Sequence, residues 1–167
     1  AYDTAGGIRL AHAMADADVD IFEQPVPADD IEGLRAVAEA APMTVEADES
    51  AVDVASVRRL LEAGACGSVC LKVAKMGGLR VCRAAAVLCD KHGIPYRFGA
   101  NMGPRLLQAQ GLHLAAACAG LRRACALAES EHILDDPFTG VPVAGGCITV
   151  PDGPGSGVVL QGDWVSA

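Results

Sequence analysis

Three ionisable residues, Glu23, Asp48 and Lys72, each follow a short apolar run of the chain. The intervals between them, 25 and 24 residues, match the length of one strand, one helix and two short loops. Such spacing indicates successive βα units, which build a parallel sheet. Because functional side chains of βα barrels gather at the carboxyl ends of the strands, we expect these three side chains to converge on one face.

The rest of the apolar pattern predicts an α/β fold in which helices and strands alternate strictly. Strands are expected over 19–22, 43–47, 69–71, 96–99 and 124–128, and helices over 4–17, 29–41, 53–63, 79–91 and 105–119. Right-handed crossovers curl such a sheet in one direction. A complete barrel has eight strands and about 250 residues, so these 167 residues predict a partial barrel of about five βα units.

The pattern changes after Leu134, where Asp-Asp-Pro and repeated glycines replace the alternating elements. Two short β-like pieces remain, over 147–150 and 158–160. We therefore expect residues 1–140 to form the barrel portion and residues 141–167 to form a carboxyl-terminal tail with short β segments.

Charge and cysteine content narrow the class of protein further. A net charge of −8 with no polybasic segment argues against nucleic-acid binding and against an anionic membrane surface. No apolar run has the length and purity of a membrane span. The seven cysteines lack a Cys-x-x-Cys pair, which favours reduced thiols and a cytoplasmic location.

Together these motifs resemble the enolase superfamily, in its mandelate racemase and muconate lactonizing enzyme branch. The resemblance rests on Glu-Gln-Pro at 23–25, Ala-Asp-Glu-Ser at 47–50, a lysine at 72, Lys-x-Gly-Gly at 75–78 and Asp-Asp-Pro-Phe at 135–138. It implies a TIM-like βα barrel of the enolase type, present here in part.

The resemblance also implies a chemistry. It gives Mg²⁺ as the cofactor, held by three carboxylates on consecutive strands, with Glu23 as the second ligand and Asp48 as the third. Lys72 is then the acid/base lysine that removes the proton α to a carboxylate of a small-molecule substrate, and the metal stabilises the resulting enediolate. Racemase or epimerase, cycloisomerase and dehydratase reactions all share this step. A nearby cation should also lower the pKa of Lys72.

Two parts of the family's machinery would fall upstream of Ala1: the first metal ligand, an Asp, and the opposite-face base. We therefore expect the chain to be the carboxyl-terminal part of a longer enzyme, inactive alone and a homo-oligomer when full length. Polar residues near the predicted site, Glu49, Asn101 and Glu129, are expected to support the metal ligands or contact the substrate. Lys75 is expected to lie in a turn with a structural or surface role.

Two other interpretations stay open at this point. An open barrel exposes a strand edge that invites pairing with another chain, so the chain could be a non-catalytic βα domain acting as an assembly partner. A phosphate-binding βα enzyme of another family is less favoured. Its anion could bind where Gly77 and Gly78 open a helix, but the acidic strand ends oppose an anion.

Overall fold

A four-stranded parallel sheet forms the centre of the molecule, which we describe over residues 1–162 of a computed structural model. Its strands pair in chain order: β1 (Ile21–Glu23), β2 (Thr44–Ala47), β3 (Ser68–Lys72) and β4 (Tyr96–Gly99). The helices between and beside them are α1 (Thr4–Ala13), α2 (Ile31–Ala40), α3 (Val54–Glu62), α4 (Leu79–His92) and α5 (Arg105–Ala116). The α/β alternation and the partial barrel predicted from the sequence are confirmed.

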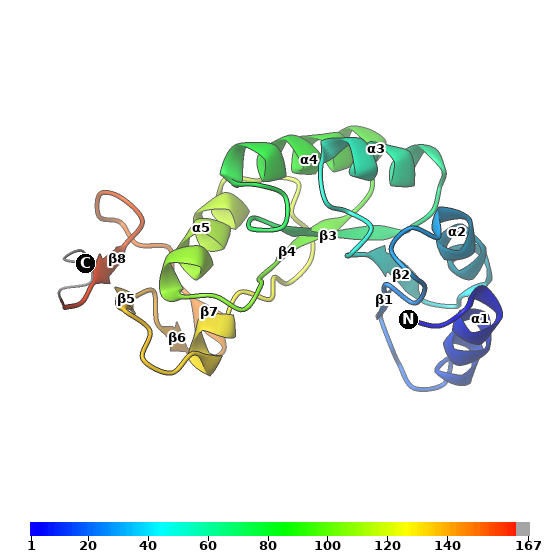
Figure 1. The fold of residues 1–167 in the computed structure, drawn as a ribbon, viewed down its shortest axis with the longest axis horizontal. Helices are drawn as coiled ribbons and strands as arrows, with labels where there is room; N and C mark the ends of the chain where they lie inside the picture. The colour runs from blue at the N-terminus through cyan, green and yellow to red at the C-terminus, as the bar shows by residue number, and fades with distance from the viewer. Residues whose placement is uncertain (163–167) are drawn as a thin grey trace.

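The helices follow the sheet along one side, so that α2, α3 and α4 form an arc over the strands (Figure 1). Helix α1 and the small strand β8 lie at opposite ends of this arc (Figure 1). Consecutive helices pack on one another, α1 with α2 and α3 with α4. This is the geometry of a barrel wall in which each βα unit lies beside the next.

Local sequence signals set where the helices begin and end. The side chain of Asp3 accepts from the amide of Gly6 at 2.6 Å, and that of Asp30 accepts from Gly33 at 2.8 Å. Helix α3 begins with a reciprocal capping box between Asp53 and Ser56. Such caps satisfy amides that the first helical turn leaves free.

Side chains alternate between the two faces of the sheet, as strand geometry requires. On the outer face, strand residues pack against the helices and are almost wholly buried; they include Val45, Val69, Leu71, Tyr96 and Phe98, which meet Leu34, Val37, Val57 and Leu60. The rings of Tyr96 and Phe98 lie edge to face, with centroids 5.7 Å apart. The inner face is instead polar, and it carries the candidate site.

The predicted fifth strand over 124–128 is wrong, because only one parallel bridge forms there, between Gly99 and Ala126. The amide of Ala126 donates to the carbonyl of Phe98 at 3.0 Å. The amide of Phe98 donates to the sulfur of Cys125 at 3.4 Å. In a longer strand pairing, this amide would instead donate to a backbone carbonyl of the fifth strand. Helices α1 and α5 also end earlier than expected, at Ala13 and Ala116.

The carboxyl-terminal segment forms two small antiparallel pairs. Strand β5 (Phe138–Gly140) pairs with β8 (Val158–Leu160), and β6 (Val143–Ala144) pairs with β7 (Cys147–Ile148). The β5–β8 pair joins the two sides of the expected boundary at 140/141, so the division into residues 1–140 and 141–167 stays a prediction. None of the helices within residues 1–162 is long and apolar enough to cross a membrane.

Candidate active site

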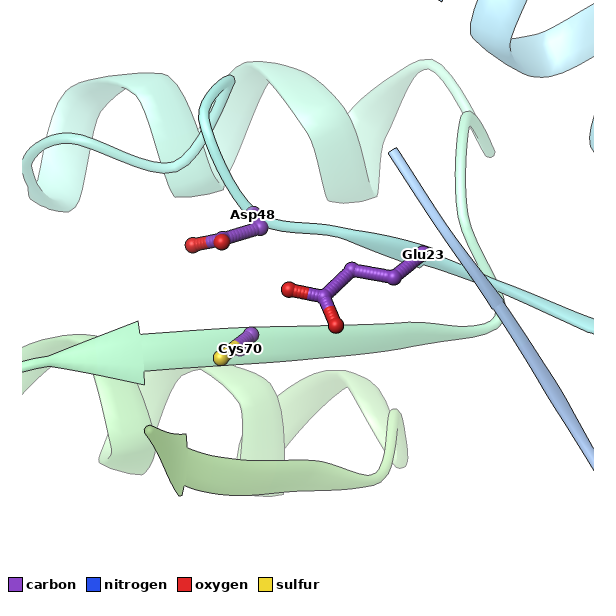
Figure 2. A group of neighbouring side chains, drawn as sticks. All are labelled: Glu23, Asp48 and Cys70. Carbon is purple, nitrogen blue, oxygen red and sulfur yellow. The ribbon is translucent and has the colours of Figure 1, made fainter. Parts of the chain in front are cut away.

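The three residues predicted to converge lie at neighbouring strand ends. Glu23 ends β1, Asp48 directly follows β2, and Lys72 ends β3. The Lys72 Nζ lies 2.5 Å from the Asp48 Oδ2. Oxygen atoms of Glu23 and Asp48 and the sulfur of Cys70 lie within 4.8 Å of one another, and Figure 2 shows these three side chains meeting from β1, β2 and β3. Their chemical roles stay predictions.

Gln24 joins the ends of β1 and β2. Its side-chain oxygen accepts from the amides of Asp48 and Ser50 at 2.9 and 3.2 Å, and its Nε2 donates to the Ser50 hydroxyl at 2.8 Å. Gln24 itself adopts a left-handed φ of 37°, a conformation uncommon outside glycine. The Glu-Gln-Pro and Ala-Asp-Glu-Ser motifs are thus held together by one amide side chain, which fixes Asp48 relative to Glu23.

Asp48 is 3% exposed in its side chain and is held by two lysines. Lys75 Nζ lies 2.5 Å from both its Oδ1 and its carbonyl oxygen. Burial raises the pKa of Asp48, but the hydrogen bonds from Lys72 and Lys75 outweigh it, and the net pKa lies below its usual value. Lys75 does lie in the turn after β3, but its ammonium group belongs to the site.

The pKa of Lys72 is set in this structure by burial and by Asp48. Burial lowers the pKa of Lys72, but the hydrogen bond and the negative charge of Asp48 raise it, and the net pKa lies above its usual value. The lowering expected from the sequence depends on a bound cation, and it stays a prediction.

Glu23 is flanked by opposing charges. Burial raises its pKa, as does the neighbouring Asp48 carboxylate, while the charge of Arg97 opposes both. Arg97, on the inner face of β4, places Nη2 2.7 Å from Glu23 Oε2 and Nε 2.7 Å from Glu46 Oε1. The second oxygen of Glu46 accepts from the Ser68 hydroxyl at 2.8 Å. An ionic network therefore underlies the predicted metal ligand.

A small cavity of about 140 Å³ opens beside these groups. A Cβ atom at Gly99 would lie 2.7 Å from the Cys70 sulfur and 3.0 Å from Lys72 Cε, so glycine keeps room for both side chains. The cavity is lined by Glu23, Cys70, Lys72, Arg97, Gly99, Ala100, Ala126 and Glu129.

The remaining predicted residues lie at different distances from this centre. Glu129 lines the cavity, and its Oε2 is buried without a hydrogen-bond partner among the described residues. It belongs to the short 3₁₀ helix Glu129–His132 and does not end a strand. Glu49 is exposed and lines a separate depression with Gln24 and Pro27. Asn101 is exposed in the loop after β4.

The sequence from residue 1 to 164 matches the family model described as "Enolase C-terminal domain-like". The chain belongs to this family. The match covers the sheet, the helices and nearly all of the tail, and it confirms the resemblance to the mandelate racemase and muconate lactonizing enzyme branch.

Named relatives of this chain are isomerases. It is 32% identical to an L-Lys-D/L-Arg epimerase of Methylococcus capsulatus, over 95% of this chain and 45% of that protein. It is 27% identical to muconate cycloisomerase 1 of Rhodococcus opacus, over 98% of this chain and 44% of that protein. The chain thus spans about half the length of the curated relatives it matches.

A solved structure agrees with these relatives. The dipeptide epimerase from Enterococcus faecalis, complexed with Mg and the dipeptide L-Leu-L-Tyr, superposes with a TM-score of 0.87 at 26% identity. The superposition covers 95% of this chain and 45% of that one.

The carboxylate oxygens of Glu23 and Asp48 fit Mg²⁺. Mg²⁺ is a hard ion that binds one or two carboxylates and keeps several waters, and Glu23 and Asp48 supply two carboxylates close together. The third nearby donor, the sulfur of Cys70, is soft and does not suit Mg²⁺.

The sequence did not reveal that Glu46, Cys70 and Arg97 belong to the site. A signal was present for two of them, because Glu46 stands between Val45 and Ala47 in a predicted strand, and Arg97 likewise interrupts an apolar strand. Charged residues at strand-interior positions that face inward require partners. That pattern could have paired the two across the sheet.

Proposed function

We propose that the protein carrying this chain is a Mg²⁺-dependent isomerase that moves the proton α to a substrate carboxylate. The observation that carries the proposal is the contact of 2.5 Å between Lys72 Nζ and Asp48 Oδ2, with the Glu23 carboxylate beside it. In this assignment Glu23 and Asp48 hold the metal, and Lys72 is the acid/base group. When bound, Mg²⁺ supplies positive charge that offsets the negative charge developing on the substrate carboxylate.

In this proposal Lys72 and Lys75 have different roles. Lys72 lines the cavity, where its Nζ can return a proton to a carbon as the ammonium group and take one as the neutral amine. Lys75 binds the carbonyl and the second carboxylate oxygen of Asp48, which fixes this ligand in one orientation. The cavity is small enough that only the reacting end of a substrate enters it, and Glu129 is one of the residues that line it.

The relatives guide the choice of reaction. Both named groups, epimerases and cycloisomerases, are isomerases, so we favour isomerisation over dehydration. The buried Glu129 oxygen, which has no hydrogen-bond partner within residues 1–162, supports a contact with the substrate. Glu49 and Asn101 remain predicted supporting residues. A cytoplasmic location and a homo-oligomeric full-length protein also remain part of this proposal.

Exchange of the α-proton, together with product formation, tests the assignment of Lys72. The complete gene product is incubated with Mg²⁺ in deuterated water with the dipeptides L-Lys-L-Arg and L-Ala-L-Glu and with cis,cis-muconate. NMR then measures deuterium incorporation and product. We expect Lys72→Met to lower the rate of product formation by about 10²–10⁴-fold, the range for loss of a positioned acid/base.

The control is Lys91→Met, which removes an exposed lysine of α4 and should leave the rate unchanged. The opposite-face base expected upstream could exchange the proton of one epimer alone, so exchange by itself does not decide. Formation of the epimerised product at the wild-type rate in Lys72→Met would remove the lysine from the mechanism. Reaction of muconate without exchange of either dipeptide would assign the protein to the cycloisomerases.

A further inference from the structure

Arg97 connects three strands of the sheet through its side chain. It starts from β4, passes over β3, and bonds Glu46 on β2 and Glu23 on β1, at 2.7 Å in each case. Its side chain is 15% exposed. A guanidinium group can do this because its Nε and Nη donors lie in one fixed plane, so the position of Glu46 determines where Nη2 meets Glu23.

Glu46 is fully buried, and both of its oxygens are occupied. One accepts from Arg97 Nε and the other from the Ser68 hydroxyl. Removing two charges from water is costly, and a buried ion pair often stabilises a fold no more than apolar residues of similar volume. Stability alone therefore does not explain the Glu46–Arg97 pair, whereas a role in holding Glu23 does.

Glu23 needs external support for its orientation. Its side chain is 39% exposed, and a glutamate has three rotatable side-chain bonds, which cost free energy to order. Arg97 binds Oε2 and leaves the other carboxylate oxygen without a bond from Arg97, and Figure 2 shows the Glu23 carboxylate beside Asp48. The charges of Glu46 and Arg97 cancel, so the pair orients the carboxylate without adding net charge at the cation site.

We propose that Arg97, fixed in place by the buried Glu46, is a positioning residue that orients the carboxylate of Glu23 for binding a divalent cation. This inference rests on the proposed function, because it assumes that Glu23 is a metal ligand. It adds two residues, Glu46 and Arg97, that do not touch the metal but set its affinity.

The test is Mg²⁺ titration calorimetry on the complete gene product and on the double variant Glu46→Met/Arg97→Met. Replacing both partners with apolar side chains of similar length avoids leaving either charge buried alone. We expect Mg²⁺ to bind about tenfold more weakly, as on loss of a partner that orients a metal ligand, while thermal unfolding stays close to that of the wild type.

A matched control removes an ion pair of the same composition far from the site. Arg35 and Glu39 form an exposed pair at 3.0 Å on α2, and Arg35→Met/Glu39→Met should leave the Mg²⁺ affinity unchanged. Arg97→Lys serves if the double variant does not fold. It keeps the charge beside Glu46 but lacks the planar fork that reaches both acids, and it should also bind about tenfold more weakly.

The outcomes separate the two proposals. If the wild type binds Mg²⁺ and the double variant, or Arg97→Lys in its place, binds within twofold of it, Arg97 does not position Glu23 and only this inference fails. If the wild type itself does not bind Mg²⁺, the metal assignment of the proposed function fails, and this inference fails with it.

Discussion

Gly99 is the single residue on which the geometry of the site depends most directly. It ends β4 opposite Lys72 in the parallel ladder, and any side chain there would meet Cys70 and Lys72. The limit is steric only, because the φ of Gly99 lies outside the left-handed region. The size of the residue at position 99 therefore sets where the lysine ammonium stands.

We predict that Gly99→Ala lowers the rate of α-proton exchange by about 100-fold, the typical cost of misplacing a reacting group by about 1 Å. The rate is measured in the complete gene product, with circular dichroism to follow folding. Adding Cys70→Ala removes the sulfur that lies 2.7 Å from the new methyl group and should restore part of the rate. Gly153→Ala, at an open position of the tail, is the control. A Gly99→Ala variant at full rate would show that Lys72 does not need its present position.

For single residues, the sequence predicted which side chains lie at strand ends but not which of the inner-face side chains contact one another. Spacing alone placed Glu23, Asp48 and Lys72 at one edge, because each follows an apolar run. It could not show that Arg97 reaches Glu23, since 74 residues separate them and the contact depends on how the sheet curls. The sequence already separated Asp48, the expected ligand, from Glu49, the expected supporting residue, and the folded turn buries Asp48 and exposes Glu49.

Among the elements, helix α2 shows how a cap can outweigh helix propensity. Its N-cap Asp30 accepts from the amide of Gly33, and Thr4 of α1 donates a longer bond of 3.4 Å to the same carboxylate. A Cβ at Gly33 would lie 2.1 Å from the Asp30 Oδ2 and 2.5 Å from the Thr4 hydroxyl. Glycine is therefore required where α1, α2 and their shared cap meet.

We predict that Gly33→Ala destabilises the fold, although alanine favours a helix interior over glycine by about 1 kcal/mol. Loss of the cap costs about 1 kcal/mol, and crowding at the junction of α1 and α2 adds to it. Urea unfolding measures the change. In the Asp30→Ala background the clash with the cap is gone, so the same substitution should cost less. Equal costs in both backgrounds would disprove the coupling.

For the helices and strands, the sequence predicted those boundaries that depend on local signals. The limits of β4 and β8 agree with the expected 96–99 and 158–160, because apolar runs bounded by turn residues define them. The expected strand over 124–128 failed because its composition could not reveal that the Cys125 thiol accepts the amide of Phe98. This hydrogen bond depends on how the folded chain brings Cys125 beside Phe98.

For the whole molecule, the open side of β1 is the main feature beyond the site. Within residues 1–162 this strand pairs only with β2. The amide of Gln24 donates to Glu46 of β2, so by alternation along the strand the amide of Ile21 faces the open edge. An unpaired edge of this kind is a template for another strand.

We predict that the isolated 167-residue chain self-associates through this edge. Sedimentation velocity over about 1–100 μM, a range in which exposed edges associate, should show a growing oligomer fraction. Ile21→Pro removes an outward donor and keeps the amides that face β2, so it should lower association. A monomer at every concentration would disprove this use of the edge and would argue against the assembly-partner interpretation.

The chain-order pairing of β1 to β4 has a consequence for biosynthesis. Each strand can dock on its predecessor as it leaves the ribosome, because a nascent chain folds from its amino-terminal side. The inner-face acids Glu23, Glu46 and Asp48 all emerge before their partners Lys72, Lys75 and Arg97. The growing sheet therefore carries unbalanced negative charge until β4 is made, and the chemical centre is the last part of the sheet to settle.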